Sequence, residues 1–255
     1  MSKEKIMLGI PAYGGNVQVL CFKSVLRLFQ DSRVLDRYDL EVVALQNESL
    51  ISRARQELAK AAMDRCYDRL FFIDADTAFT PEQFLAVVDA NKDVIGGTYM
   101  KKTLSNPGLN FNVSKEMNSE MLARFQTTPT TLPGFEIFKR EFCKENPIVK
   151  VNHVPTGFLC IKTDVLRALT PKVPRYLSGV RDPNRVFYSP EEVEKMQVPE
   201  LFPVSVQNGT LESEDWGFCR LCTENGIDVF LHTNVVVQHI GQITFHPSMF
   251  RLKEE

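Results

Sequence analysis

The sequence predicts an α/β fold with a mostly parallel β-sheet flanked by helices. Through the first half of the 255-residue chain, strand-like and helix-like segments alternate, which is the pattern of successive βαβ units. One segment, LFFI at residues 70–73, is an unbroken apolar run, as is typical of a strand buried on both faces of a parallel sheet. Ligands of such sheets bind beyond the carboxyl ends of the strands, so those ends are the first place to look for function.

Each segment along the chain supports the predicted α/β fold. The first strand, IMLGI, runs into the turn PAYGG and an amphipathic helix at residues 17–29. Strand DLEVVAL, a helix from about Leu50 to Met63, strand RLFFIDAD, a capped helix in TPEQFLAVVDAN and strand DVIGGTY follow. Later, VKVNHVPTGFLCIKTDVLRAL predicts two strands around a Pro-Thr-Gly turn and a helix capped by Asp164. The helix SEDWGFCRLCTENG and the β-branched strand TNVVVQHIG complete the pattern.

Two stretches lack clear periodicity. Residues 104–146 and 171–210 are rich in Asn, Thr and Pro or in Pro, Arg and acidic residues, so we expect long irregular loops there. The chain shows no internal repeat and no separate linker. A single domain over residues 1–255 is therefore the simplest prediction.

The amino-acid composition of the chain makes some functional classes less favoured. A net charge of -2 and a pI near 6.1 provide no overall attraction to nucleic acid or to an anionic membrane. No apolar stretch reaches the roughly 20 residues that cross a bilayer, so we expect a soluble or at most peripheral protein. Six cysteines lie mostly in apolar stretches without a preceding leader, which predicts a reduced, cytoplasmic protein. Cys219 and Cys222 form a CxxC that we interpret as helix packing rather than a zinc site.

Two carboxylates end the apolar strand. Asp74 and Asp76 are separated by one alanine, so on an extended segment both side chains point the same way. Their mutual repulsion needs compensation, and a divalent cation would supply it. The sequence therefore predicts a cation site at this strand end.

Two arginines, Arg53 and Arg55, lie in the first turns of the helix that begins near Leu50. A helix N-terminus favours anions, so cations there suggest an anionic partner such as a phosphate group. The alternative is a surface arginine that pairs with Glu48 or Glu57.

Further acidic and imidazole groups occur near the end of the chain. Glu214 and Asp215 precede the only tryptophan, Trp216, at a helix start, where acidic residues are commonly caps. His239 follows an apolar run at a strand end. A lone histidine is usually structural, but imidazole is also a good ligand for a transition metal.

Taken in order, the segments FFIDADTAFTPEQF, VPTGFLCIKTDVL, SEDWGFCRLCTENG and VVVQHIG resemble the landmarks of nucleotide-sugar glycosyltransferases of the GT-A fold. Within this fold, the sequence most resembles the family 2-like enzymes of bacteriophages and large viruses. The resemblance implies a Rossmann-like sheet, with residues 1–103 as the nucleotide-sugar-binding half and residues 104–255 as the acceptor half. It also implies a UDP-type or GDP-type donor sugar and an Asp-x-Asp (DXD) motif that works with Mg²⁺ or Mn²⁺.

The resemblance assigns roles to particular residues. It implies that the nucleotide contacts are Pro11, Ala12, Tyr13, Arg53 (with Arg55 as the alternative), Asp74 and Asp76. It implies that Asp76 binds the metal, with His239 as a further ligand and Asp74 beside them. Asp215 is the candidate base that takes the proton of the acceptor hydroxyl, with Glu214 second, if the enzyme inverts configuration. In a retaining enzyme Asp215 would lose that role.

Several alternatives remain open at this point. The acceptor is a glycan or, less favoured, a hydroxylated base of phage DNA, to which the basic stretch PKVPRYLSGVRDPNR could bind. The segment DADT also resembles the Asp-x-Asp of haloacid-dehalogenase-like phosphatases, although here it ends about the third strand rather than the first. A third possibility is a domain without catalysis that binds sugars or proteins.

Overall fold

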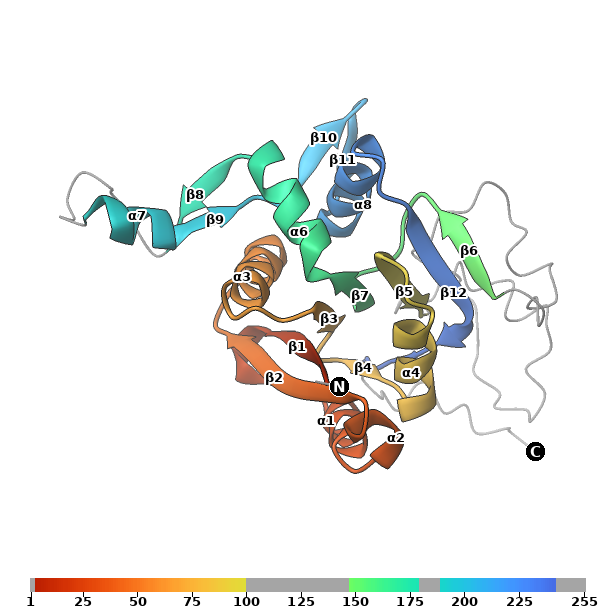
Figure 1. Cartoon of the computed structure of the whole chain (residues 1–255). Helices are drawn as coiled ribbons and strands as arrows, with labels where there is room; N and C mark the ends of the chain where they lie inside the picture. Colours follow the sequence, from red (N-terminus) through yellow and green to blue (C-terminus); the bar gives the residue numbers. More distant parts are fainter. Residues whose placement is uncertain (1–2, 100–146, 179–188, 242–255) are drawn as a thin grey trace, which may run out of the picture.

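A seven-stranded β-sheet forms the centre of the computed structural model, which describes residues 3–99, 147–178 and 189–241 (Figure 1). Across the sheet the strands are β2 (Tyr38–Gln46), β1 (Glu4–Ala12), β3 (Arg69–Ile73), β7 (Phe158–Lys162), β5 (Val94–Thr98), β12 (Val229–Val236) and β6 (Ile148–Val151). Strands β2, β1, β3, β5 and β12 share one direction, whereas β7 and β6 run against their neighbours. The predicted α/β fold with a mostly parallel sheet is confirmed.

Helices cover both faces of the sheet (Figure 1). One face carries α1 (Val19–Leu28), α2 (Ser32–Leu35) and α4 (Pro81–Asp89), and the other carries α3 (Ile51–Asp64), α6 (Thr163–Leu169) and α8 (Glu214–Glu224). Each layer encloses its own hydrophobic cluster against the sheet. Among the described residues, no helix is both long and apolar enough to cross a membrane.

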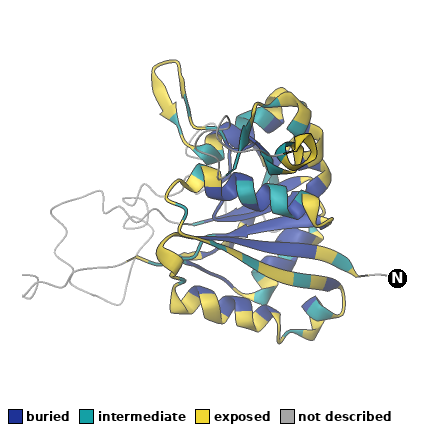
Figure 2. Cartoon of the chain, turned by 90° about the vertical axis from the view of Figure 1, so that its left-hand side faces the viewer, coloured by how far each residue is buried: buried dark blue, intermediate teal, exposed yellow. Residues whose placement is uncertain are grey.

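Strand β3 is buried at every position, as its apolar run predicts. Its side chains alternate between the two clusters: Phe72 packs against Phe202 on the α3 side, and Phe71 packs against Phe84 and Phe158 on the α4 side. Each fully buried phenylalanine contributes about 1.5–3 kcal/mol. The edge strand β2 is instead buried only at Tyr38, and its other residues are exposed or partly buried, in keeping with the mixed colouring at the sheet edge in Figure 2.

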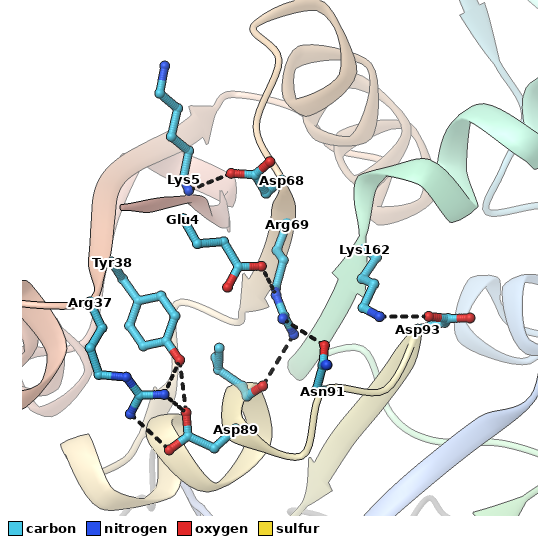
Figure 3. A network of polar contacts seen from close by, with 11 residues as sticks. Glu4, Lys5, Arg37, Tyr38, Asp68, Arg69, Asp89, Asn91, Asp93 and Lys162 are labelled. Atoms are coloured by element: carbon cyan, nitrogen blue, oxygen red, sulfur yellow. Dashed lines mark hydrogen bonds and ion pairs between the residues drawn. The ribbon is translucent and has the colours of Figure 1, made fainter. Parts of the chain in front are cut away.

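Polar contacts tie together the amino end of the parallel strands (Figure 3). Arg69, the first residue of β3, is buried and donates to Glu4 at 2.5 Å, to the Val88 carbonyl at 3.2 Å and to Asn91 at 3.1 Å. Lys162, at the end of the antiparallel β7, pairs with Asp93 at 3.0 Å. These contacts fix the strands relative to one another at the end opposite to the Asp-x-Asp turn.

Some local expectations need correction. The described part of residues 171–210, expected to be irregular, contains the short helix η3 (Thr170–Lys172), the pair β8 (Arg175–Leu177) and β9 (Gln197–Pro199), helix α7 (Pro190–Met196) and strand β10 (Ser205–Gln207), which pairs with β11 (Thr210–Glu212). Helix α7 forms because Ser189 and Glu192 make a capping box. Asp164 does not cap α6, because β7 runs directly into the helix and Lys162 is the N-cap. The other irregular stretch, residues 104–146, lies outside the described residues.

Candidate functional site

A cavity of about 330 Å³ lies at the carboxyl ends of β1 and β3. It is lined by Pro11, Tyr13, Asn16, Gln18, Ile51, Asp74, Ala75 and Asp76. Neighbouring parallel strands end at the same edge of a sheet, so the turns after β1 and β3 meet there. Of the turn residues expected to bind a nucleotide, Pro11 and Tyr13 line the cavity, and Ala12 is buried beneath them.

The chain turns sharply after β1. Gly14 and Gly15 adopt positive φ angles of 71° and 72° within the short helix η1 (Tyr13–Gly15), a backbone conformation that glycine adopts without steric cost. The Gln18 N–H then donates to the Ala75 carbonyl at 2.8 Å, which fastens the start of α1 to the Asp-x-Asp turn. The turn leaves Tyr13, which lines the cavity, 73% exposed.

Asp76 and His239 are brought together by a small antiparallel sheet. Strand β4 (Thr77–Ala78) pairs with β13 (Gln238–His239), with Thr77 opposite His239. The Ile240 N–H donates to the Asp76 carbonyl at 2.8 Å, and Nε2 of His239 lies 3.6 Å from Oδ1 of Asp76. The two residues that the resemblance implies as metal ligands are thus neighbours in space.

The donor atoms of Asp76 and His239 fit a divalent cation that is also held by a substrate. Mg²⁺ is usually bound by one or two carboxylates together with substrate phosphates, and imidazole is a good ligand for transition metals. Within the described parts of the chain, no group of three or more His, Cys, Asp and Glu side chains could hold a metal by itself.

Arg55 connects the Asp-x-Asp turn with helix α8. Its side chain is only 3% exposed; Nη2 donates to Oδ1 of Asp74 at 2.9 Å and Nε donates to Oε1 of Glu214 at 3.3 Å. Burial opposes the charged form, but the carboxylates of Asp74 and Glu214 outweigh it and raise the pKa of Arg55 above its ordinary value. The third nitrogen, Nη1, is buried without a hydrogen-bond partner among the described residues.

Arg53 lies elsewhere. It is exposed and pairs with Glu48, with Nε at 2.5 Å from Oε2 and Nη2 at 2.7 Å from Oε1. This is the surface pairing that the sequence left as the alternative, and Arg53 is not among the residues that line the cavity. The structure therefore brings Arg55, rather than Arg53, to the Asp-x-Asp turn.

Asp215 is held by donors on three sides. Nε2 of His153 lies 3.1 Å from its Oδ2, and Oδ1 accepts from the Trp216 N–H at 2.9 Å and from the Ser213 hydroxyl. Nε2 of His153 makes no well-aligned hydrogen bond among the described residues, so this close contact is weaker than an aligned hydrogen bond. Burial raises the pKa of the Asp215 carboxyl, but His153, Ser213 and Trp216 outweigh it, so the pKa lies below its ordinary value. Asp215 is therefore ionised at neutral pH.

Two residues of this region were not singled out in the sequence. His153 is fully buried and stacks on Trp216, with ring centroids 4.4 Å apart and planes at 18°. Tyr99 packs its ring on His239 at 4.6 Å. Tyr99 directly follows strand β5, so the strand-end rule that found Asp74 would also have found it, whereas nothing in the sequence marks His153.

The Pro-Thr-Gly turn fits closely against these groups. A Cβ atom on Gly157 would lie 2.7 Å from Oδ2 of Asp74 and 2.8 Å from the Tyr99 hydroxyl oxygen, so only glycine fits there without displacement. The Asp74 N–H also donates to the Gly157 carbonyl at 3.0 Å. Burial, followed by the negative charge of Asp74, raises the pKa of Tyr99, which keeps the phenol protonated.

The chain matches no protein-family model and no curated protein. Among solved structures it is similar to A197 from STIV, with 15% identity, a TM-score of 0.45 and coverage of 95% of this chain and 99% of that one. It is similar to GalNAc-T7 solved with UDP, GalNAc and Mn²⁺ (10% identity, TM-score 0.49, 94% and 44% covered). It is also similar to a 4-diphosphocytidyl-2C-methyl-D-erythritol synthase from Anaerococcus prevotii (12% identity, TM-score 0.40, 99% and 94% covered). We therefore base the functional proposal on the residues of this chain.

Proposed function

We propose that the protein is a metal-dependent glycosyltransferase that moves a sugar from a nucleoside-diphosphate sugar of the UDP or GDP type to a hydroxyl of a glycan, with inversion of configuration. The observation that carries the proposal is the pair Asp76 and His239 beside the cavity that Tyr13 and Asp74 line. The cavity volume of about 330 Å³ lies in the range of small-molecule sites.

Each polar or aromatic group near the cavity has a proposed role in binding the donor nucleotide-sugar. Pro11 and Tyr13 offer an apolar and aromatic wall to the base of the nucleotide. Asp76 and His239, with Asp74 nearby, would hold Mn²⁺ or Mg²⁺, which when bound neutralises negative charge on a departing diphosphate. Arg55 keeps its charge although it is buried, and through its pair with Asp74 it places positive charge behind the Asp-x-Asp turn, which favours a diphosphate at that turn.

The acceptor end of the site depends on Asp215. Its carboxylate is ionised, and Oδ2, which meets only His153, keeps a lone pair that can take the proton of an acceptor hydroxyl. Glu214, the second candidate, is already engaged by Arg55. Trp216 is 38% exposed beside Asp215 and offers an aromatic surface to a sugar ring.

Among the acceptors, a glycan is favoured over DNA. Of the basic residues that could bind a DNA backbone, Arg175 pairs with Glu194 at 3.0 Å and is not available to phosphate groups without breaking that pair. Residues 179–188, which hold two further arginines of this stretch, lie outside the described residues.

The test is calorimetry with UDP-sugars and GDP-sugars in the presence and absence of Mn²⁺. We expect binding that requires the metal, and a loss of at least about tenfold in affinity for both Asp76→Asn and His239→Ala. Asp164→Asn, an exposed aspartate on α6, is the control and should bind normally. Equal binding with and without metal, or normal metal-dependent binding in both site variants, would contradict the proposal.

A further inference from the structure

Helix α1 carries an apolar stripe on its outer face. The stripe consists of Val19, Phe22, Leu26 and Phe29, which are 66%, 55%, 42% and 39% exposed. Their spacing of three and four residues places them in one row along the helix. The opposite side of α1 is also apolar, because Cys21, Val25 and Leu28 pack into the core. Single exposed apolar residues need no explanation, but a continuous row marks a surface that is covered by something else.

Basic residues run along one side of this α1 stripe. Lys23 and Arg27 are exposed one turn apart, and neither forms an ion pair within the part of the chain that the structure describes. Residues 6–30 contain no Asp or Glu, although the whole chain is slightly acidic. The helix therefore combines an apolar row with a local positive charge.

The charges of Lys23 and Arg27 distinguish between two partners that could cover the stripe, namely a second copy of the chain and an anionic lipid surface. In an antiparallel pairing of α1 with α1 of a second copy, each side of the helix meets the same side of the other. Lys23 and Arg27 would then face their own counterparts without an acidic residue between them, which is unfavourable. An anionic lipid surface accepts both features, because the apolar side chains enter the boundary of the acyl chains while the basic groups contact the headgroups.

We propose that α1 docks on an anionic membrane surface and lies in the plane of that surface. The exposed aromatic rings of Phe22 and Phe29 are suited to this boundary region. Gln18, which lines the cavity, directly precedes the helix, and Tyr13 of the same cavity lies six residues before Val19, so docking brings the cavity close to the lipid surface. This inference does not depend on glycosyltransferase activity, since it rests on the surface of α1 alone.

The experiment is co-sedimentation of the full chain with vesicles of phosphatidylcholine, with and without phosphatidylglycerol. We expect binding at low salt to the vesicles that contain phosphatidylglycerol, and weaker binding in high salt. The double variant Phe22→Ser/Leu26→Ser should lose about tenfold or more of this binding. Lys23→Ala/Arg27→Ala should lose the preference for the anionic lipid.

The hairpin β10–β11 provides a matched control. Its Val206 and Leu211 are 67% and 69% exposed, so Val206→Ser/Leu211→Ser removes apolar groups that are even more exposed than Phe22 and Leu26, and this variant should bind vesicles normally. Circular dichroism confirms that each variant folds. Absence of vesicle binding by the unaltered chain, or an equal loss in the control, would overturn the proposal. So would a dimer in light scattering that Phe22→Ser/Leu26→Ser converts to a monomer, because a second copy would then cover the stripe.

Discussion

The contact between His153 and Asp215 should stabilise the folded protein by a measurable coupling energy. His153→Phe keeps an aromatic ring that can stack on Trp216 but removes the nitrogen that lies 3.1 Å from the carboxylate. Asp215→Asn removes the negative charge. A charge-assisted hydrogen bond contributes about 1.5–3 kcal/mol, and the poor alignment of this one favours the lower end. We therefore expect a coupling of about 1.5 kcal/mol at pH 7 from the two single variants and the double variant.

The coupling should depend on pH in a defined direction. The pKa of Asp215 lies below its ordinary value in the folded protein, so the stabilisation is fully present above the ordinary aspartate pKa of about 3.9. It should be lost as the pH falls through the lower, folded value, because the carboxylate then takes up a proton. Urea unfolding followed by circular dichroism, repeated at several pH values, measures both effects.

The exposed pair Arg167 and Asp164, 2.9 Å apart on α6, serves as the control for this cycle. Both side chains face water, so their coupling should stay within about 0.5 kcal/mol at every pH. A coupling between His153 and Asp215 no larger than that of the control at pH 7 would refute the reasoning. A coupling that persists unchanged in acid would refute the assignment of its pH dependence to Asp215.

Three further predictions concern other parts of the structure. Arg55→Lys should weaken nucleotide-sugar binding about tenfold, because the single nitrogen of lysine cannot pair with Asp74 and Glu214 together, whereas Arg53→Lys should leave calorimetric affinity unchanged; equal effects would contradict the distinction. Gly217→Ala should lower the free energy of unfolding by about 2 kcal/mol, because its Cβ would lie 2.1 Å from the Pro203 carbonyl oxygen; thermal denaturation at the wild-type midpoint would argue against this packing. Thr80→Ala should cost about 1 kcal/mol in urea unfolding, because it removes the capping box of α4; an unchanged midpoint would show that the cap contributes nothing.

Local pattern was sufficient for the frame of the molecule. The run LFFI predicted the buried strand β3, and the capping signal TPEQ predicted the start of α4, because both depend on neighbouring residues alone. The rule that parallel strands end at one edge also placed Pro11, Tyr13, Asp74 and Asp76 at a common cavity. These outcomes follow from the sequence because few alternative arrangements satisfy the same pattern.

The choice between Arg53 and Arg55 could not be made from the sequence. Residues two apart on a helix point in nearly opposite directions, so only one of the two can face the turn. Which one does depends on how α3 packs, and the guanidinium of Arg55 lies 5.3 Å from the ring centroid of Phe72. That contact joins segments that no local pattern relates.

His153 was missed for a similar reason. Its partner Asp215 lies 62 positions later, on a helix whose packing is fixed by contacts such as that of the Cys219 thiol with the Val154 carbonyl at 3.7 Å. A buried histidine in a short connection between strands has no distinctive spacing. Only the tertiary arrangement reveals that its ring faces a carboxylate.

The pairing of β4 with β13 also affects the order in which the site forms during synthesis and folding. Asp76 belongs to the first third of the chain, but its neighbour His239 is added only after more than 160 further residues have been synthesised. A nascent chain with β1 to β5 complete therefore has its Asp-x-Asp turn without the imidazole. The two side chains can meet only after residue 239 has been synthesised, and closing so long a loop makes their meeting a late event in folding as well.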